Sequence, residues 1–298
     1  MNVAIYGAGN AGSGVAAILR RRPGVTVRGP FGRAQRERAL GGGDDAVVIA
    51  TTSFLHAVAP DIRRAVEAGA NVLTTAEEAA YPWAADAGLA SELDALARER
   101  GVTILGAGLN PGFAFDALVL TALGAVADVR ALRVTRVVDL SGFSEAVLRR
   151  IGVGHAPDAF AAGVAGGTIV GHIGFAQSMR LVAARLGVAI DRIDRSLAPV
   201  VVAGRTAGFE QRDVALVAGA PWFEARFSGH VDPVAAGWEP RDAIHVDADP
   251  PVDLTVAPGL RSQAGSAAVI ANSVRRLVDA PPGWCTVAEL PPATPGPW

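Results

Sequence analysis

Residues 3–12 read VAIYGAGNAG, an apolar run that leads directly into three glycines with the spacing GxGxxG. We expect the apolar run to form a strand and the segment Gly14–Arg22 to form the helix that follows it. Gly7 permits a tight turn between them, Gly9 lets the backbone approach a pyrophosphate, and Gly12 lets the helix pack closely on the strand. The stretch therefore predicts the strand, turn and helix that open a dinucleotide-binding fold.

A bound phosphate group would meet the start of this helix. The backbone amides of Asn10 and Ala11 open the helix, and the positive end of the helix dipole lies behind them. Residues 46–50 predict a buried parallel strand, and Thr51 and Thr52 follow it where a cofactor would cross the strand ends. We therefore expect the cofactor to contact these four residues as well as the three glycines.

The end of the second predicted strand indicates which dinucleotide is bound. NAD-specific domains usually carry Asp or Glu there, because the carboxylate holds the adenosine ribose. Residues 28–33 read RGPFGR, without an acid, and Arg33, Arg36 and Arg38 cluster instead. Guanidinium groups suit a 2′-phosphate, although such a cluster is also common on a solvated helix face. The pattern favours NADP and leaves NAD possible.

Composition excludes several classes of protein. Half of the 298 residues are hydrophobic and 19% are charged. The net charge of -2 does not indicate the basic surface that nucleic-acid binding requires. The most apolar stretch, residues 161–176, is short and glycine-rich, which argues against a membrane span. We expect no signal peptide, no metal site and, with Cys285 as the single cysteine, no internal disulfide. These features predict a cytoplasmic protein.

All 27 basic residues are arginine. A GC-rich genome is the simplest source of this bias. Because lysine is absent, proton transfer must use carboxylates, His, Tyr or water, and no lysine can form a Schiff base.

The first 110 residues alternate between strands and helices. Strands are expected over 3–6, 25–28, 46–50, 71–73 and 102–105, and helices over 14–22, 59–68 and 91–100. Such alternation predicts right-handed crossovers and a doubly wound parallel sheet, the Rossmann form of the α/β class.

Beyond Pro111 the pattern changes. Helices are expected over 113–123 and 169–186, and strands over 131–139, 197–203, 214–217, 224–228, 243–246 and 252–256. The short strands alternate apolar and polar residues and are bounded by Gly, Pro and Asp, which is typical of an antiparallel or mixed sheet. This region therefore predicts an α+β domain.

The chain end returns to the first domain. A last helix is expected over 264–278, and the proline-rich tail from Pro281 is expected to be extended. We therefore expect a dinucleotide-binding domain formed by 1–110 with 262–298, and a domain for substrate binding and dimerisation formed by 111–261.

Two adjacent acids, Glu77 and Glu78, follow the strand 71–73 in the stretch TTAEE. Open α/β sheets bind ligands outside the carboxyl ends of their strands, so a carboxylate here can lie near a nicotinamide. Thr74 with Glu77, or Thr75 with Glu78, also fits a capping box for the next helix. Capping would occupy one acid and leave the other free to hold an ammonium or iminium group and exchange its proton.

The stretch GAGLNPGF at residues 106–113 ends the first domain. Asn110 before Pro111 is a plausible N-cap with proline at the first helical position. The glycines could also let this backbone pass close to a nicotinamide.

These motifs together resemble the 2,4-diaminopentanoate dehydrogenases and the native amine dehydrogenases, two branches of the dihydrodipicolinate reductase-like superfamily. The resemblance covers nearly the whole chain and is carried by TTAEE (74–78), YPW (81–83), GAGLNPGF (106–113), Asp116, GHIGF (171–175), Gln177, Ser178, Asn272, PPGW (281–284) and ELP (289–291). The lysine-bearing signature of true dihydrodipicolinate reductases is absent.

The resemblance implies NAD(P)-dependent oxidative deamination of an amine, or reductive amination of a ketone or aldehyde with ammonia. A glutamate at the position of Glu77 or Glu78 would bind and deprotonate the amine, and the register favours Glu77 slightly. We expect Asn110, Phe113 and His172 to bind the substrate. The family also implies a homodimer, for which the second domain offers an apolar sheet.

His172 falls within the long apolar helix predicted over 169–186. A lone histidine there can be a satisfied core residue, but the resemblance at residues 171–174 equally suggests a residue that lines the substrate pocket. His56 and His155 are expected in loops, and His230 and His245 in the sheet.

The chain departs from the family in two loops. Residues 140–145 read LSGFSE where relatives tend to carry basic residues, and residues 259–263 read GLRSQ in place of the usual glycine-aspartate form. Substrates that bear a carboxylate are therefore less favoured than a simple amine or a hydrophobic ketone.

Two other functions compete with an amine dehydrogenase. A reductase of a cyclic imine or a carbonyl compound would oxidise NADPH without ammonia. A non-catalytic NADP-binding sensor would bind cofactor without turnover, since fold does not guarantee function.

Overall fold

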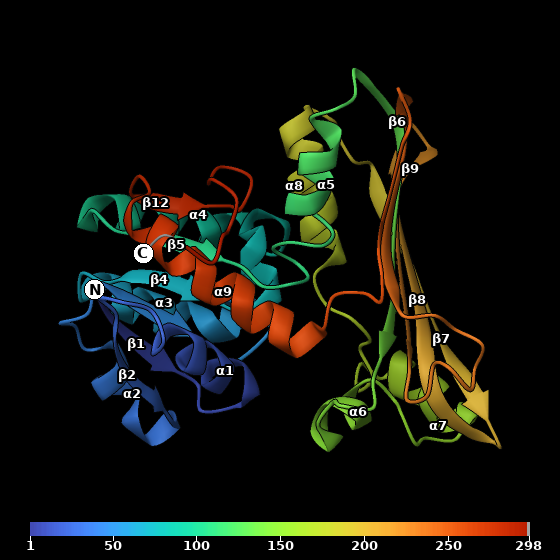
Figure 1. Ribbon diagram of the computed structural model, residues 1–298, viewed down its shortest axis with the longest axis horizontal. Helices are drawn as coiled ribbons and strands as arrows, with labels where there is room; N and C mark the ends of the chain where they lie inside the picture. The colour runs from blue at the N-terminus through green and yellow to red at the C-terminus, as the bar shows by residue number, and fades with distance from the viewer. Residues whose placement is uncertain (297–298) are drawn as a thin grey trace.

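The computed structural model describes residues 1–296 and contains two six-stranded sheets (Figure 1). Sheet A has the order β12-β5-β4-β3-β1-β2, and every neighbouring pair is parallel. Its strands are β1 (Asn2–Tyr6), β2 (Thr26–Phe31), β3 (Ala46–Ile49), β4 (Asn71–Thr74), β5 (Thr103–Gly106) and β12 (Gly283–Cys285). The parallel sheet confirms the predicted Rossmann form.

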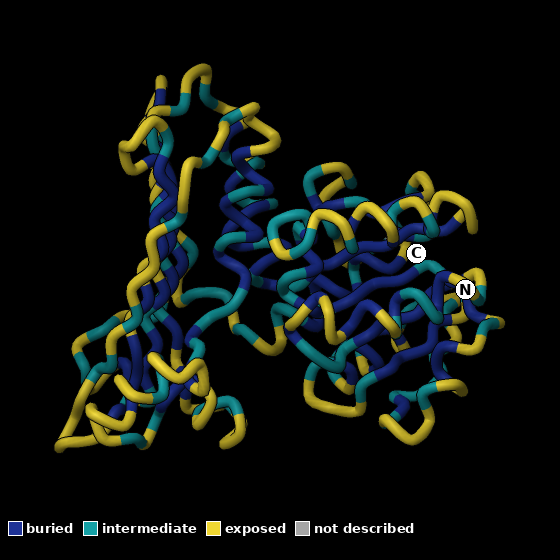
Figure 2. The backbone as a smooth tube through the Cα atoms, turned by 180° about the vertical axis from the view of Figure 1, so that it is seen from behind, coloured by how far each residue is buried: buried dark blue, intermediate teal, exposed yellow. Residues whose placement is uncertain are grey.

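Helices cover both faces of sheet A. Helices α1 (Asn10–Leu19) and α9 (Ser262–Val278) pack on one face, and α3 (Leu55–Glu67) and α4 (Ala87–Arg100) on the other, while the short α2 (Arg36–Leu40) lies beside β2. Alternate residues of strand β1 point into the two hydrophobic cores, one on each face of the sheet. Val3 and Ile5 face α1 and α9, whereas Ala4 and Tyr6 face α3. Strands β3 and β5 in the interior of the sheet are accordingly buried at every residue, whereas the edge strand β2 is half-buried over most of its length (Figure 2).

Sheet B is mixed, as predicted, with the order β11-β10-β6-β9-β8-β7. The pair β6 and β9 is parallel and the other pairs are antiparallel. Its strands are β6 (Asp128–Asp139), β7 (Arg192–Val202), β8 (Arg205–Val217), β9 (Ala220–His230), β10 (Arg241–Asp249) and β11 (Val252–Val256). Helices α5 (Ala117–Leu123) and α8 (Phe175–Leu186) lie between sheet B and the layers around sheet A (Figure 1). Helices α6 (Glu145–Arg150) and α7 (Pro157–Ala165), which were not predicted, lie near one end of sheet B.

The outer face of sheet B is charged, so the expectation of an apolar sheet was wrong for this face. Glu224 on β9 accepts ion pairs from Arg212 at 2.7 Å, from Arg226, and from Arg133 at 3.7 Å. Strand β9 alternates Glu224 and Arg226 with Phe223, Ala225 and Phe227, which belong to the buried core on the inner side. On β9 the apolar signal at residues 223, 225 and 227 belongs to the inner face.

The long helix predicted over 169–186 begins only at Phe175, so His172 lies in a loop. Gly171 (φ 63°) and Gly174 (φ 112°) occupy the left-handed region, which interrupts a helix. His56 was also misplaced, because α3 begins at Leu55.

Helix α5 likewise starts later than predicted. Its N-cap is Asp116, which accepts a hydrogen bond from the amide of Ala117 at 2.7 Å, and not Asn110. The carboxylate of Asp116 also accepts bonds from the amide of Gly112 and the hydroxyl of Ser178, both at 2.8 Å. This buried carboxylate ties the turn before α5 to α8.

Within residues 1–296, no helix has the length and apolar character needed to span a bilayer.

Candidate active site

Of the three glycines in the turn at residues 7–12, Gly9 is the one at which the described protein leaves space for a side chain. Gly7 has φ +125°, and a Cβ there would lie 2.2 Å from the carbonyl oxygen of Ala50. A Cβ on Gly12 would lie 1.9 Å from the carbonyl oxygen of Gly7, so helix and strand touch at this point. Gly9 is the N-cap of α1, without a side-chain cap, and a Cβ on it would meet no atom of the described residues within 4 Å. The first turn of α1 also contains no acid, so its positive end faces open space where an anion could bind.

A cavity of about 490 Å³ lies beside this turn, at the carboxyl ends of β3, β4 and β5; we call it the cofactor cleft. Its lining residues are Ala11, Ala50, Thr51, Thr52, Ser53, Phe54, Thr75, Glu77, Gly108, Leu109, Asn110, Pro111, Val147, Arg150, Ser266 and Ile270. The hydroxyl oxygen of Thr51 is buried without a hydrogen-bond partner in the structure. An unpaired buried hydroxyl is costly, so a ligand partner is expected here.

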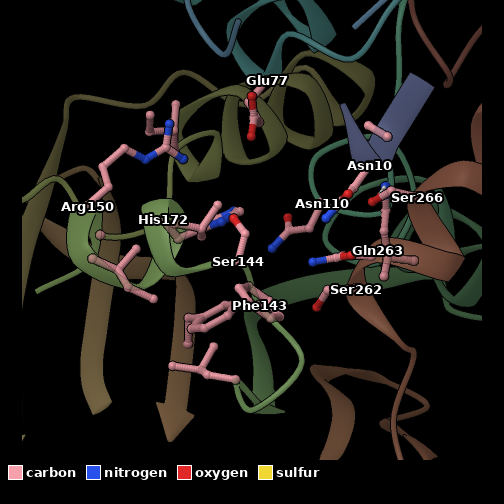
Figure 3. Close-up of a pocket in the computed structure, with 18 of the residues that line it drawn as sticks. Asn10, Glu77, Asn110, Phe143, Ser144, Arg150, His172, Ser262, Gln263 and Ser266 are labelled. Atoms are coloured by element: carbon pink, nitrogen blue, oxygen red, sulfur yellow. Dashed lines mark hydrogen bonds between the residues drawn. The ribbon is translucent and has the colours of Figure 1, made fainter. Parts of the chain in front are cut away.

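A second cavity, of about 550 Å³, opens between the two sheets; we call it the substrate pocket (Figure 3). It shares Ala11, Glu77, Leu109, Asn110, Val147, Arg150 and Ser266 with the cofactor cleft. Much of the remaining wall is apolar and includes Leu140, Phe143, Ile151, Ile173, Phe209 and Phe227. The shared residues therefore stand where a cofactor and a substrate would meet.

The adjacent acids Glu77 and Glu78 have different surroundings. The carboxylate of Glu78 accepts a hydrogen bond from the amide of Leu55 at 2.7 Å and thereby caps α3. The side chain of Glu77 points into the substrate pocket (Figure 3) and lines both cavities. Neither predicted capping box forms: the 3-10 turn Glu77–Ala80 has no side-chain cap, and the Thr74 hydroxyl accepts from the amide of Ala76 instead.

Burial raises the pKa of Glu77 above its ordinary value, and the negative charge of Glu78 adds to this rise. Hydrogen bonds from its own backbone and from Ser53, and the positive charge of Arg150, oppose the shift but do not cancel it. A carboxylate with a raised pKa inside a cleft is suited to exchanging a proton with a substrate.

Arg150 was not found from the sequence. It ends α6 and lines both cavities, and its positive charge acts on Glu77. None of the motifs that carry the family resemblance includes Arg150, so the sequence did not mark it.

Asn110 is placed at the junction of the two cavities. Both its side-chain oxygen and its side-chain nitrogen are buried without a hydrogen-bond partner in the structure. Because an amide rarely forgoes all of its hydrogen bonds in a protein interior, its partner is expected to be a ligand. Phe113, predicted beside it, lines neither cavity; Phe143, Phe209 and Phe227 supply aromatic rings to the pocket instead.

His172 lies on the wall of the substrate pocket. Its ring packs 4.6 Å from the ring of Phe175 and stacks nearly parallel on Phe227 at 5.4 Å. Burial, with the positive charges of Arg136 and Arg195 among others, lowers the pKa of His172 to about 3. The imidazole is therefore neutral at physiological pH, and its Nε2 is buried without a hydrogen-bond partner among residues 1–296.

The arginines after β2 differ in whether other residues of the described chain already bind their guanidinium groups. Arg36 is held by Asp61 at 2.6 Å, by the carbonyl of Pro60 at 2.9 Å and by Glu37 at 2.9 Å. Arg33, in the 3-10 turn Arg33–Gln35, has no ion pair among the described residues and is exposed. The guanidinium of Arg38 lies 5.4 Å from the centre of the Phe31 ring, so among the clustered arginines of the described chain Arg33 is left most available for a phosphate.

The polar groups of the cleft fit a nicotinamide dinucleotide. The open N-terminus of α1 suits a pyrophosphate, and Thr51 and Asn110 offer buried, unpartnered polar atoms further along the same cleft. Across residues 1–296 there is no group of three or more His, Cys, Asp or Glu side chains that could hold a metal ion.

Comparison with known proteins decides the family. Residues 113–295 match the family model of the 2,4-diaminopentanoate dehydrogenase C-terminal domain. The chain is 30% identical to the 2,4-diaminopentanoate dehydrogenase of Acetoanaerobium sticklandii, over 98% of this chain and 93% of that protein. The chain belongs to the 2,4-diaminopentanoate dehydrogenase family.

Solved structures agree on the fold. The amine dehydrogenase from Mycobacterium smegmatis matches with a TM-score of 0.84 at 22% identity, covering 99% of this chain and 97% of that chain. The DAP dehydrogenase of C. glutamicum in complex with DAP matches with a TM-score of 0.51 at 13% identity, covering 100% and 96%. Membership of the 2,4-diaminopentanoate dehydrogenase family confirms the predicted resemblance and the prediction of an NAD(P)-dependent oxidoreductase that acts on amino compounds.

Proposed function

We propose that this member of the family is an NADP-preferring amine dehydrogenase in which Glu77 transfers the proton. The proposed reaction interconverts an amine with a ketone or aldehyde and ammonia. The observation that carries the proposal is the position of Glu77: its carboxylate lies on the shared wall of the cofactor cleft and the substrate pocket, and burial raises its pKa. A substrate ammonium group is a cation that such a carboxylate would bind and deprotonate.

In the direction of deamination, the Glu77 carboxylate holds the ammonium group and accepts one of its protons. When bound, a nicotinamide cofactor would accept the hydride from the amine-bearing carbon. Water then adds to the resulting iminium carbon, and ammonia leaves as the carbonyl forms. In reductive amination the same steps run backwards, and protonated Glu77 returns its proton to the new amine.

Asn110 and His172 would orient the substrate and the cofactor around Glu77. Both have buried polar atoms without a protein partner at the cavity walls. His172 is neutral, so its Nε2 can form a hydrogen bond without adding positive charge beside a substrate ammonium.

The pocket favours a substrate with apolar substituents. Phe143, Phe209 and Phe227 contribute aromatic surface, and the charge of the buried Arg136 is neutralised by Asp242 at 2.9 Å. Arg136 also donates to a backbone carbonyl, so it has little to offer a substrate carboxylate. The apolar part of the pocket therefore suits a simple amine or a hydrophobic ketone, while Arg150 contributes a positive charge at the wall shared with the cofactor cleft.

We assign the cofactor to residues 1–110 with 262–298 and the substrate to 111–261. The preference for NADP rests on the missing acid after β2 and on the exposed, unpaired Arg33 within the described chain.

A homodimer is proposed to form through the outer face of sheet B, which carries no helix in the described part of the chain (Figure 1). Light scattering coupled to size-exclusion chromatography would measure its mass. A cytoplasmic location stays a prediction from the sequence.

The function is tested by NADPH oxidation against a panel of ketones and aldehydes, with and without high ammonia. We expect turnover that requires ammonia. Turnover without ammonia would make the protein an imine or carbonyl reductase, and NADPH binding without turnover would make it a sensor; either result would overturn the proposal.

A further inference from the structure

We propose that Gln211, which does not line either cavity, is a positioning residue that fixes His172 for its contact with the substrate. The proposal rests on the proposed function, because it assumes that His172 meets the substrate in the pocket. Gln211 lies on β8, and only 2% of its surface is exposed.

The side-chain amide of Gln211 binds both backbone groups of His172. Its Oε1 accepts from the His172 amide at 2.8 Å, and its Nε2 donates to the His172 carbonyl oxygen at 3.1 Å. The same Nε2 donates to Asp213 Oδ1 at 2.9 Å. This third bond fixes which way round the amide lies, because only the nitrogen can donate to a carboxylate and a carbonyl.

A positive charge completes the arrangement. The guanidinium of Arg195 lies 4.0 Å from Asp213 and 3.4 Å from both Gln211 Oε1 and the His172 carbonyl oxygen, and it also donates to the carbonyl of Val170. The loop that carries His172 is thus held by β7 and β8 on the inner side of sheet B.

Gly171 makes this close approach possible. A Cβ on Gly171 would lie 2.5 Å from Gln211 Oε1, and its φ of +63° disfavours side chains in any case. The backbone of the loop can therefore sit against the Gln211 amide, whereas a residue with a side chain would push it away.

The loop itself has no helix to hold His172 in place. Stacking on Phe175 and Phe227 sets the tilt of the imidazole, but stacked rings can slide. The two hydrogen bonds from Gln211 fix the backbone from which the ring projects. We therefore assign to Gln211 the alignment of His172 Nε2, an atom that is buried, unpartnered and at the pocket wall.

The test is a double-mutant cycle between Gln211→Leu and His172→Ala. Leucine has nearly the volume of glutamine but cannot form the hydrogen bonds. We expect Gln211→Leu to lower kcat about 10- to 100-fold with the KM for NADPH unchanged, as loss of alignment would do. We expect the double variant to be no slower than His172→Ala alone, because Gln211 acts through His172.

Thr206→Val is the matched control, since Thr206 lies on the same strand, is equally buried and has no hydrogen-bond partner for its hydroxyl in the described part of the chain. It should leave kcat unchanged. Gln211→Glu keeps the acceptor for the His172 amide and serves in the same cycle if the leucine variant does not fold. Losses that add up in the double variant would overturn the inference.

A readout without turnover separates this inference from the proposed function. The Cε1–H signal of His172 in an NMR spectrum, assigned with His172→Ala, should shift or broaden in Gln211→Leu and stay unchanged in Thr206→Val. An unchanged signal in Gln211→Leu overturns the positioning role. Absence of ammonia-dependent turnover in the wild-type protein would refute only the proposed function.

Discussion

The two walls of the active-site cleft are built in different ways. On the side of sheet A, the ligand-facing groups are backbone amides and residues at strand ends, and a local turn such as residues 7–12 places them. On the side of sheet B, His172, Arg150 and Phe227 come from a loop, a short helix and a strand that are far apart in the sequence. The first wall is set by local backbone conformation, and the second by contacts between distant segments.

Glu77 and Glu78 show the same contrast within two residues. Both follow β4, yet one faces the pocket and the other caps α3. Their comparison gives the largest expected effect.

We expect Glu77→Gln to lower kcat for amine oxidation about 10²- to 10⁴-fold, because an amide cannot accept the proton. Glu78→Gln should retain activity within about tenfold and lower the thermal midpoint, since the cap on the amide of Leu55 is weakened. Steady-state kinetics and thermal denaturation of both variants measure this. Equal loss in the two variants, or the reverse order, would show that the acids were assigned to the wrong roles.

Much of the sheet A wall was predictable from the sequence. The strand, turn and helix around Gly7, Gly9 and Gly12 follow from a pattern whose physical requirements are local. The acid pair was found for the same reason, because it follows a strand end. The sequence could not separate Glu77 from Glu78, since the amide that Glu78 caps belongs to Leu55, 23 residues away.

The sheet B wall was predictable only by resemblance. Apolar periodicity continued through residues 169–174, so the loop that carries His172 was predicted as helix; Gly171 and Gly174 break it. Asn110 was given a capping role because Pro111 follows it, whereas Asp116 caps α5 by accepting from the amide of Ala117 and is also bound by Ser178 of α8. Arg150 and Gln211 act through distant partners and leave no local signal.

A pair of glycine substitutions tests how the sheet A wall works. Gly12→Ala places a Cβ against the Gly7 carbonyl oxygen, so we expect a loss of about 1–3 kcal/mol of stability together with weaker NADPH binding. Gly9→Ala has free space in the protein and a backbone conformation open to alanine. It should leave the thermal midpoint nearly unchanged and weaken NADPH binding more than tenfold, because its methyl group lies where the pyrophosphate approaches. Thermal denaturation and fluorescence titration with NADPH distinguish the two, and normal NADPH binding by Gly9→Ala would contradict the phosphate site.

The cofactor preference gives a smaller effect. Arg33→Ala should lower the ratio of NADPH to NADH affinity about tenfold, the value of one hydrogen bond between charged groups. Arg36→Ala should change this ratio less and lower the thermal midpoint, because its guanidinium is occupied by Asp61. Titrations of both cofactors measure the ratio. A larger change for Arg36→Ala than for Arg33→Ala would transfer the phosphate contact to Arg36.

The smallest effect concerns the stability cost of the carboxylate that joins the two walls. Burial raises the pKa of Glu77 in the folded protein, so the folded state keeps this proton to a higher pH than the unfolded chain does. The contribution of Glu77 to stability must therefore fall as pH rises from the unfolded pKa through the folded one, and remain low above it. A glutamine at this position carries no charge, so its contribution to stability does not fall with pH in this way.

We expect Glu77→Gln to be more stable than the wild type at pH 8 by about 1 kcal/mol, or about 2 °C in thermal midpoint. This difference in stability should narrow as the pH is lowered toward 5. Thermal denaturation of both proteins at several pH values measures the gap. A gap that is constant with pH, or a variant less stable than the wild type at pH 8, would mean that the protein stabilises the Glu77 carboxylate, and the proton-transfer role would lose its electrostatic basis.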